Sequence, residues 1–111
     1  MGNFLCTDDD PVKAVSLVAP YAVFVHTKDF YVKPGNTDNP GGGHFISRGG
    51  NYLKGTIIGH GVVPVKQCMK ILKNAGYNGY FSIEFEGMED NIEALTIGLA
   101  NLKRFIAELS V

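Results

Sequence analysis

The chain has 111 residues and a formal net charge of -1, with 45% hydrophobic and 19% charged residues. This composition is that of a folding domain, and the absence of a basic excess or stripe argues against a dedicated nucleic-acid binder. No apolar run approaches the ~18 residues of a membrane span, and the N-terminus lacks the layout of a signal peptide. Only two cysteines occur, Cys6 and Cys68, in no spaced framework. We therefore expect a cytoplasmic protein with reduced thiols, a pattern that still leaves one disulfide open.

The first predicted helix follows the acidic run Asp8-Asp9-Asp10. Asp10 can cap it, Pro11 suits the first helical position, and the acidic run complements the helix dipole. Pro20 bars continuation of the helix, so we expect it to end near Val18.

A β-prone run, YAVFVHTKDF, occupies residues 21–30. It is apolar on both faces and ends in polar groups, among them His26, Lys28 and Asp29. This pattern predicts a buried parallel strand over residues 22–28 whose C-terminal end opens onto a site. The competing interpretation of His26 is a packed or hydrogen-bonded structural histidine, which is the commoner case for a lone strand histidine.

Residues 30–61 contain nine of the 14 glycines. We expect a long irregular, glycine-rich active-site loop here, because a segment of this length is seldom a passive connector. Within it, HFISRGGNYLKGTII predicts a short hairpin across Gly49 and Gly50.

The remaining elements are a helix, a strand and a helix. The helix should run from Pro64 to Ala75 and stop at Gly76, and the strand is GYFSIEFEG at residues 79–87. Asp90 and Glu93 predict a capping box for the last helix. Its apolar stripe is expected to be core packing: Ile92, Leu95, Leu99, Leu102, Ile106 and Leu109.

The order helix-strand-helix-strand-helix indicates an α/β chain with two parallel strands and a right-handed crossover. Two strands cannot shield a parallel sheet on both faces, so residues 1–111 read as a single partial domain of a larger sheet. We expect exposed apolar faces that are covered either by homo-oligomerisation or by the remainder of the fold.

Catalytic groups in parallel α/β architectures gather at the C-terminal ends of strands. His26 lies near the end of the first strand, and Glu84 and Glu86 lie at the end of the second. On neighbouring strands about 4.8 Å apart, an imidazole and a carboxylate can meet on one Mn²⁺, Mg²⁺, Co²⁺ or Zn²⁺ ion. The alternative for Glu84 is a salt-bridged or hydrogen-bonded carboxylate. Burial of carboxylates without a cation or donors is costly, however, and two of them at one strand end favour a functional site.

Several motifs together resemble the C-terminal part of one superfamily: Gly2-Asn3-Phe4, DPVKAVSLVAPY, VFVHTKD and IGHGVVPVKQCMKILKNAGYNGYFSIEFEG. That superfamily is the xylose-isomerase-like (β/α)₈ barrels of sugar phosphate isomerases and epimerases. The resemblance covers nearly the whole chain, and its most specific parts are H-x-K-D, the G-x-G turn and AGYxGYxSIE. It implies the C-terminal quarter to third of a TIM barrel.

The resemblance also implies site residues. His26 and Glu84 match the metal ligands at the ends of barrel strands seven and eight, and Glu84 is the candidate catalytic residue. Lys28 and Arg48 match positions that contact substrate oxygens or phosphate. The second-rank candidates are Glu86, His60 and Asp29, and for His60 a tight turn at Gly59-His60-Gly61 is the first interpretation.

The implied reaction is isomerisation or epimerisation of a sugar or sugar phosphate through an enediolate. Related barrels complete the metal site with a glutamate from strand five and an aspartate from strand six, and this sequence lacks both. We therefore expect the chain alone to bind metal weakly and to show no turnover. Two alternatives stay open: a fragment of an abasic-site endonuclease-type barrel, and a non-catalytic interaction or ligand-binding module.

Overall fold

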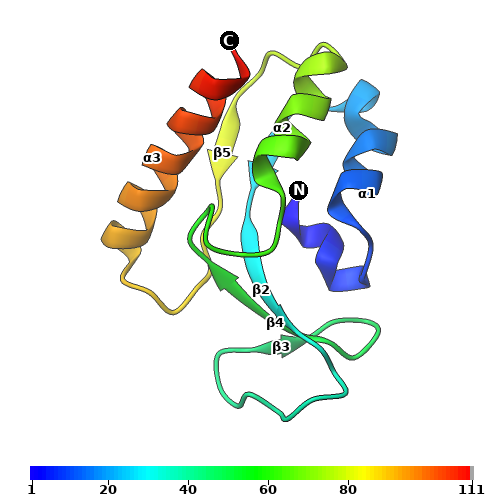
Figure 1. Cartoon of the computed structure of the whole chain (residues 1–111), viewed down its shortest axis with the longest axis vertical. Coiled ribbons are helices and arrows are strands. Elements are labelled where there is room, and N and C mark those ends of the chain that lie inside the picture. The colour runs from blue at the N-terminus through cyan, green and yellow to red at the C-terminus, as the bar shows by residue number, and fades with distance from the viewer. Residues whose placement is uncertain (111) are drawn as a thin grey trace.

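The structure, a computed structural model, describes residues 1–110 as a mixed α/β chain with three helices lying side by side and α2 packed against both α1 and α3 (Figure 1). An antiparallel sheet extends beyond one end of the helices. The elements in chain order are the 3₁₀ helix η1 (Gly2–Thr7), α1 (Pro11–Val18), the 3₁₀ helix η2 (Ala19–Tyr21), β1 (Val25–Thr27), β2 (Asp29–Lys33), β3 (Phe45–Ile46), β4 (Tyr52–Thr56), α2 (Val65–Asn74), β5 (Phe81–Ile83) and α3 (Asn91–Leu109).

The helix boundaries follow the local signals in the sequence. The Asp10 side chain accepts a hydrogen bond from the Val12 N–H at 3.2 Å, as expected for an N-cap, and α1 ends at Val18 as predicted. Helix α2 ends before Gly76, whose φ of 92° is a left-handed conformation that a side chain would strain. These predictions are confirmed.

Strands β1 and β5 form the predicted parallel pair, with His26 opposite Ser82 and Thr27 opposite Ile83. The first strand is shorter than the predicted 22–28 and is not buried on both faces. Val23, just before it, is 91% exposed. The prediction of a doubly buried strand was wrong for this reason: β1 has a partner on one edge only, so nothing in residues 1–110 covers its first part.

The extended backbone continues from β1 into β2 and changes partner at Lys28, so one segment serves two sheets. Strand β2 pairs antiparallel with β4, and β4 pairs with β3. The prediction that residues 30–61 are irregular was therefore wrong for β2 and β4, but residues 34–44 form no helix or strand. The hairpin across Gly49 and Gly50 is confirmed. An isolated parallel bridge joins Gly55 to Gly87, and a Cβ atom on Gly55 would collide with the Glu86 carbonyl.

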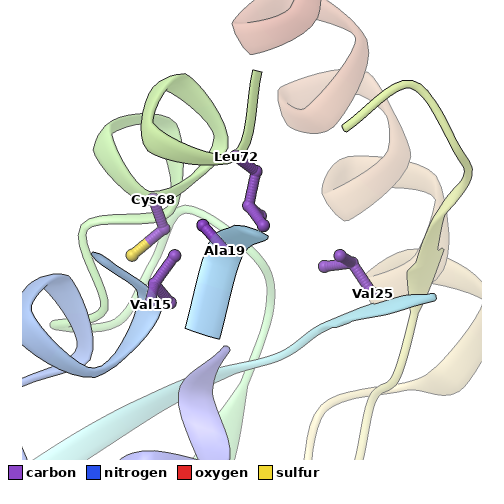
Figure 2. Close-up of a cluster of buried hydrophobic side chains, with 5 residues drawn as sticks. All are labelled: Val15, Ala19, Val25, Cys68 and Leu72. Carbon is purple, nitrogen blue, oxygen red and sulfur yellow. The ribbon is translucent and has the colours of Figure 1, made fainter. Parts of the chain in front are cut away.

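Two apolar clusters lie between the strands and the helices. In the first, Cys68 and Leu72 of α2 face Val15, Ala19 and Val25 (Figure 2). The second joins α2 to α3 through Ile58, Val63, Val65, Met69 and Leu102. Phe81 packs against both clusters. The side chains of Val25 and Phe81 therefore point toward the helices, and alternation along the strands places His26 and Ser82 on the opposite face.

Helix α3 uses a different face from the one that its sequence pattern predicted. Its buried side is formed by small residues and one leucine, Ala94, Gly98 and Leu102. Ile92 is 78% exposed, and Leu95, Leu99 and Ile106 are also exposed. The prediction that the whole stripe is core packing was wrong for these residues, because no described element covers them. No helix within residues 1–110 is both long and apolar enough to cross a membrane.

Candidate metal and substrate site

The structure brings together the imidazole and the carboxylate on which the predicted site depends. His26 lies in β1, and Glu84 directly follows β5, where its backbone N–H donates to the Thr27 carbonyl at 2.9 Å. This bond extends the parallel ladder by one residue and fixes Glu84 beside His26. The His26 Nδ1 atom lies 3.7 Å from Glu84 Oε2. About 60% of the His26 side chain and 32% of the Glu84 side chain remain exposed, so both are accessible to a ligand.

Lys28 lies where the chain passes from one sheet to the other, and its ammonium binds both glutamates of the second strand end. Its Nζ atom is 3.3 Å from Glu84 Oε1 and 3.4 Å from Glu86 Oε1. The side chain is buried and its charge lies over the Phe30 ring, 5.2 Å from the centroid. One oxygen of Glu84 therefore binds the lysine while the other faces the histidine.

Ser82 is a member of this site that sequence reasoning missed. Its hydroxyl lies 3.1 Å from His26 Nδ1 and donates to the Val25 carbonyl at 3.2 Å. The signal was present in the sequence, since Ser82 and Glu84 share one face of the predicted strand. Only the register of the parallel pair, however, places the serine opposite the histidine.

Asp29, a second-rank candidate, holds a turn and does not join the site. Its carboxylate is fully buried and accepts hydrogen bonds from four backbone N–H groups, at 2.9 to 3.1 Å. The donors are Phe30, Gly59, Gly61 and Val63. Burial raises the pKa of the Asp29 carboxyl, although the four backbone hydrogen bonds oppose that shift.

The turn that Asp29 holds is the G-x-G motif, so the structural interpretation of Gly59-His60-Gly61 accounts for it. The backbone N–H of His60 donates to the Ile57 carbonyl at 2.9 Å, and its side chain is exposed. Among the described residues, no hydrogen bond or ion pair joins His60 to His26 or Glu84.

Arg48 lies in the turn between β3 and β4 and is not brought to the site by any contact. Its backbone N–H donates to the Cys6 carbonyl at 2.9 Å, and it forms no salt bridge within residues 1–110. This turn is held by Asp8, which accepts from Ser47 Oγ at 2.6 Å and from Asn51 Nδ2 at 2.9 Å. Those hydrogen bonds lower the pKa of the Asp8 carboxyl. The sequence assigned Asp8 to the helix start and missed this contact.

His26 and Glu84 fit a divalent cation as two of its ligands. They offer a neutral nitrogen and an anionic oxygen, the donor types that Mn²⁺, Co²⁺ and Zn²⁺ accept, from side chains close enough to contact one ion. Within residues 1–110, no group of three or more His, Cys, Asp or Glu side chains is gathered around one point for a metal.

Comparison with family models, with curated proteins and with solved structures gave no match for this chain. What the fold itself defines is a mixed α/β chain with one two-stranded parallel sheet and one three-stranded antiparallel sheet. Its ionisable groups His26, Lys28, Glu84 and Glu86 meet where the parallel strands end.

Proposed function

We propose that the chain is the C-terminal portion of a divalent-metal-dependent sugar or sugar phosphate isomerase or epimerase with a xylose-isomerase-like (β/α)₈ barrel. The observation that carries the proposal is the convergence of His26 and Glu84 at the C-terminal ends of two neighbouring parallel strands. Barrels of this architecture build their active sites at that end of their strands. The residues that converge are those that the resemblance implies as metal ligands.

The uncovered apolar surface supports the barrel part of the proposal. Tyr21, Val23 and Phe24, just before β1, are exposed, and α3 exposes most of its apolar stripe: Ile92, Leu95, Leu99 and Ile106. In a closed barrel, neighbouring strand–helix units would cover both of these surfaces. We propose the remainder of the barrel as the partner of these surfaces, with a second copy of the chain as the alternative occupant.

The residues of this chain would divide the chemistry between them. His26 and Glu84 would hold the cation together with ligands from elsewhere in the barrel. When bound, the cation supplies Lewis-acid stabilisation of the charge that develops on the substrate oxygens as a proton leaves the adjacent carbon. Glu84 would also accept or return a proton at that carbon, and the Lys28 ammonium would neutralise a substrate oxygen or phosphate.

Binding of Mn²⁺ tests the proposal directly. The purified chain should bind Mn²⁺ weakly at millimolar concentration, measured by electron paramagnetic resonance, and should show no isomerase turnover. Both His26→Ala and Glu84→Gln should abolish this binding, because each removes one of two ligands. His60→Ala is the matched control, since that histidine is exposed and lies outside the site. Mn²⁺ binding that survives both site substitutions, or no binding at all, would contradict the proposal.

A further inference from the structure

Helix α3 lies at one edge of the molecule and keeps a regular apolar face exposed (Figure 1). This exposed stripe has four members, each 43% to 78% exposed: Ile92, Leu95, Leu99 and Ile106. Leu102 continues the same spacing, but it packs into the cluster that joins α3 to α2. Steps of three, four and seven residues keep the exposed members on one side of the helix, as in the apolar seam of two paired helices.

The exposed stripe is symmetrical about Leu99. Ile92 lies seven residues before Leu99 and Ile106 lies seven residues after it, about 10.5 Å of helix in each direction. When two copies of α3 lie antiparallel with their Leu99 side chains at the centre, Ile92 of each copy is level with Ile106 of the other. A two-fold contact between identical chains requires a surface that is complementary to itself in this way.

The charges of α3 favour the antiparallel direction. Arg104 and Glu108 pair with each other, whereas Glu93 and Lys103 form no ion pair within residues 1–110. Glu93 lies six residues before Leu99 and Lys103 lies four residues after it, so in an antiparallel pair their levels differ by only about 3 Å. A parallel pair would set glutamate level with glutamate and lysine level with lysine, and would align the two helix dipoles.

We propose that the exposed stripe of α3 is a docking surface for the same helix of a second copy of this chain, packed antiparallel about Leu99. Four apolar side chains from each copy leave water, and two symmetrical contacts between Glu93 and Lys103 fix the direction. The inference takes up the second occupant named above and concerns chains of these 111 residues alone, where no remainder of a barrel competes for the stripe. It does not depend on the metal chemistry of His26 and Glu84.

Sedimentation equilibrium of the chelator-treated chain tests the contact. We expect the measured mass to rise with concentration toward twice the mass of one chain. Leu99→Glu sets two like charges against each other at the centre of the pair and should weaken the dimer at least about 100-fold. Leu17→Glu is the matched control, because Leu17 is 69% exposed on α1 and should leave the mass unchanged. A chain that stays monomeric, or an association that folded Leu99→Glu does not weaken, overturns the inference.

Charge reversal tests the direction of the pair. Glu93→Lys and Lys103→Glu each place like charges near one another in the antiparallel pair, so each should weaken the dimer about fivefold. The double variant with both substitutions should restore the affinity, which a mere weakening of the start of α3 by Glu93→Lys would not allow. Unchanged affinities in the single variants, or no restoration in the double variant, overturn the antiparallel arrangement.

Mn²⁺ binding by monomeric Leu99→Glu separates this inference from the proposed function. Leu99 lies outside the candidate metal site, so the variant should bind Mn²⁺ as the unsubstituted chain does. A chain that dimerises through α3 and binds no Mn²⁺ upholds the inference and contradicts the proposed function. A monomeric chain that binds Mn²⁺ does the reverse.

Discussion

Glu84 and Asp29 both follow a strand of the parallel pair closely, yet their carboxylates are held in opposite ways. Asp29 is fully buried and bonds only to backbone N–H groups, four in all. Glu84 is partly exposed, and its carboxylate contacts two side-chain groups, the ammonium of Lys28 and the imidazole of His26. The sequence presented both as candidate site residues.

The difference separates a structural carboxylate from one that can serve a ligand. The backbone N–H donors are held in place by the folded turn, so a ligand that approached Asp29 would have to break four hydrogen bonds. The partners of Glu84 are side chains, one of them a histidine that is 60% exposed, and they can rearrange around a substrate or cation. In this chain, the type of donor distinguishes the buried carboxylate of Asp29 from the accessible carboxylate of Glu84, which the spacing of acidic residues does not do.

Removal of each carboxylate in turn should have the largest effect on stability. Asp29→Ala leaves several buried N–H groups without an acceptor, at roughly 1–3 kcal/mol for each such group, so we expect a loss of at least about 3 kcal/mol of unfolding free energy. Glu84→Gln should change it by no more than about 1 kcal/mol. Urea denaturation followed by circular dichroism measures both. Similar losses for the two variants would remove the distinction.

The helix-facing side of β1 packs against the cluster that contains Cys68 of α2, and the reactivity of that thiol tests whether this side is closed. Burial raises the pKa of Cys68 from 9.0 to about 11, and the side chain is fully buried, whereas Cys6 is partly exposed. The shift alone implies about 100-fold less thiolate at neutral pH, so Cys68 should react with a thiol reagent at least about 100-fold more slowly than Cys6. Two fast-reacting thiols in the folded chain would show that this side is open.

Removal of Lys28 should change the affinity of the exposed Glu84 carboxylate for a cation. The ammonium competes with any cation for Glu84 and Glu86, so Lys28→Met should tighten Mn²⁺ binding by about fivefold, equivalent to about 1 kcal/mol. The control is Lys13→Met on α1, which should leave the affinity unchanged. Weaker Mn²⁺ binding in Lys28→Met would mean that the lysine orients the ligands more than it competes with the ion.

The pH dependence of stability should have opposite signs for two aspartates. Because the folded pKa of Asp8 lies below its ordinary 3.8, the stability from Asp8 is present above that pH and is lost as pH falls through the folded pKa. Asp29 has a raised folded pKa, so its contribution falls as pH rises from 3.8 through that pKa.

The Asp8 effect should be small, because this carboxylate is exposed. The amide shift of Gly49, which donates to Asp8 Oδ2, should follow its titration with a midpoint below 3.8. In Asp8→Asn the same amide should show no such transition. A midpoint at or above 3.8 would contradict the assigned hydrogen bonds.

The sequence predicted the elements whose causes are local. Asp10 and Pro11 set the start of α1, and Gly76 sets the end of α2. The proximity of His26 to Glu84 was also predictable, because the two residues lie near the ends of predicted parallel strands and match motifs of the resemblance.

The rest depends on contacts that a single sequence does not reveal. The many glycines of residues 30–61 indicate turns, so the composition of this segment does not reveal the antiparallel strands within it. The stripe of α3 is apolar whether or not another element covers it, so its pattern alone does not show which of its residues are buried. Ser82 becomes a partner of His26 only once the strand register is known.

The bridge between Gly55 and Gly87 joins the two sheets by backbone alone, next to Glu86. In a saturation-mutagenesis library selected for folded protein, position 55 should accept no replacement, not even alanine, while neighbouring Lys54 should tolerate many. A methyl group added at position 55 would collide with the Glu86 carbonyl and displace Glu86 from the Lys28 ammonium, so a substitution in β4 would alter the candidate site across the bridge.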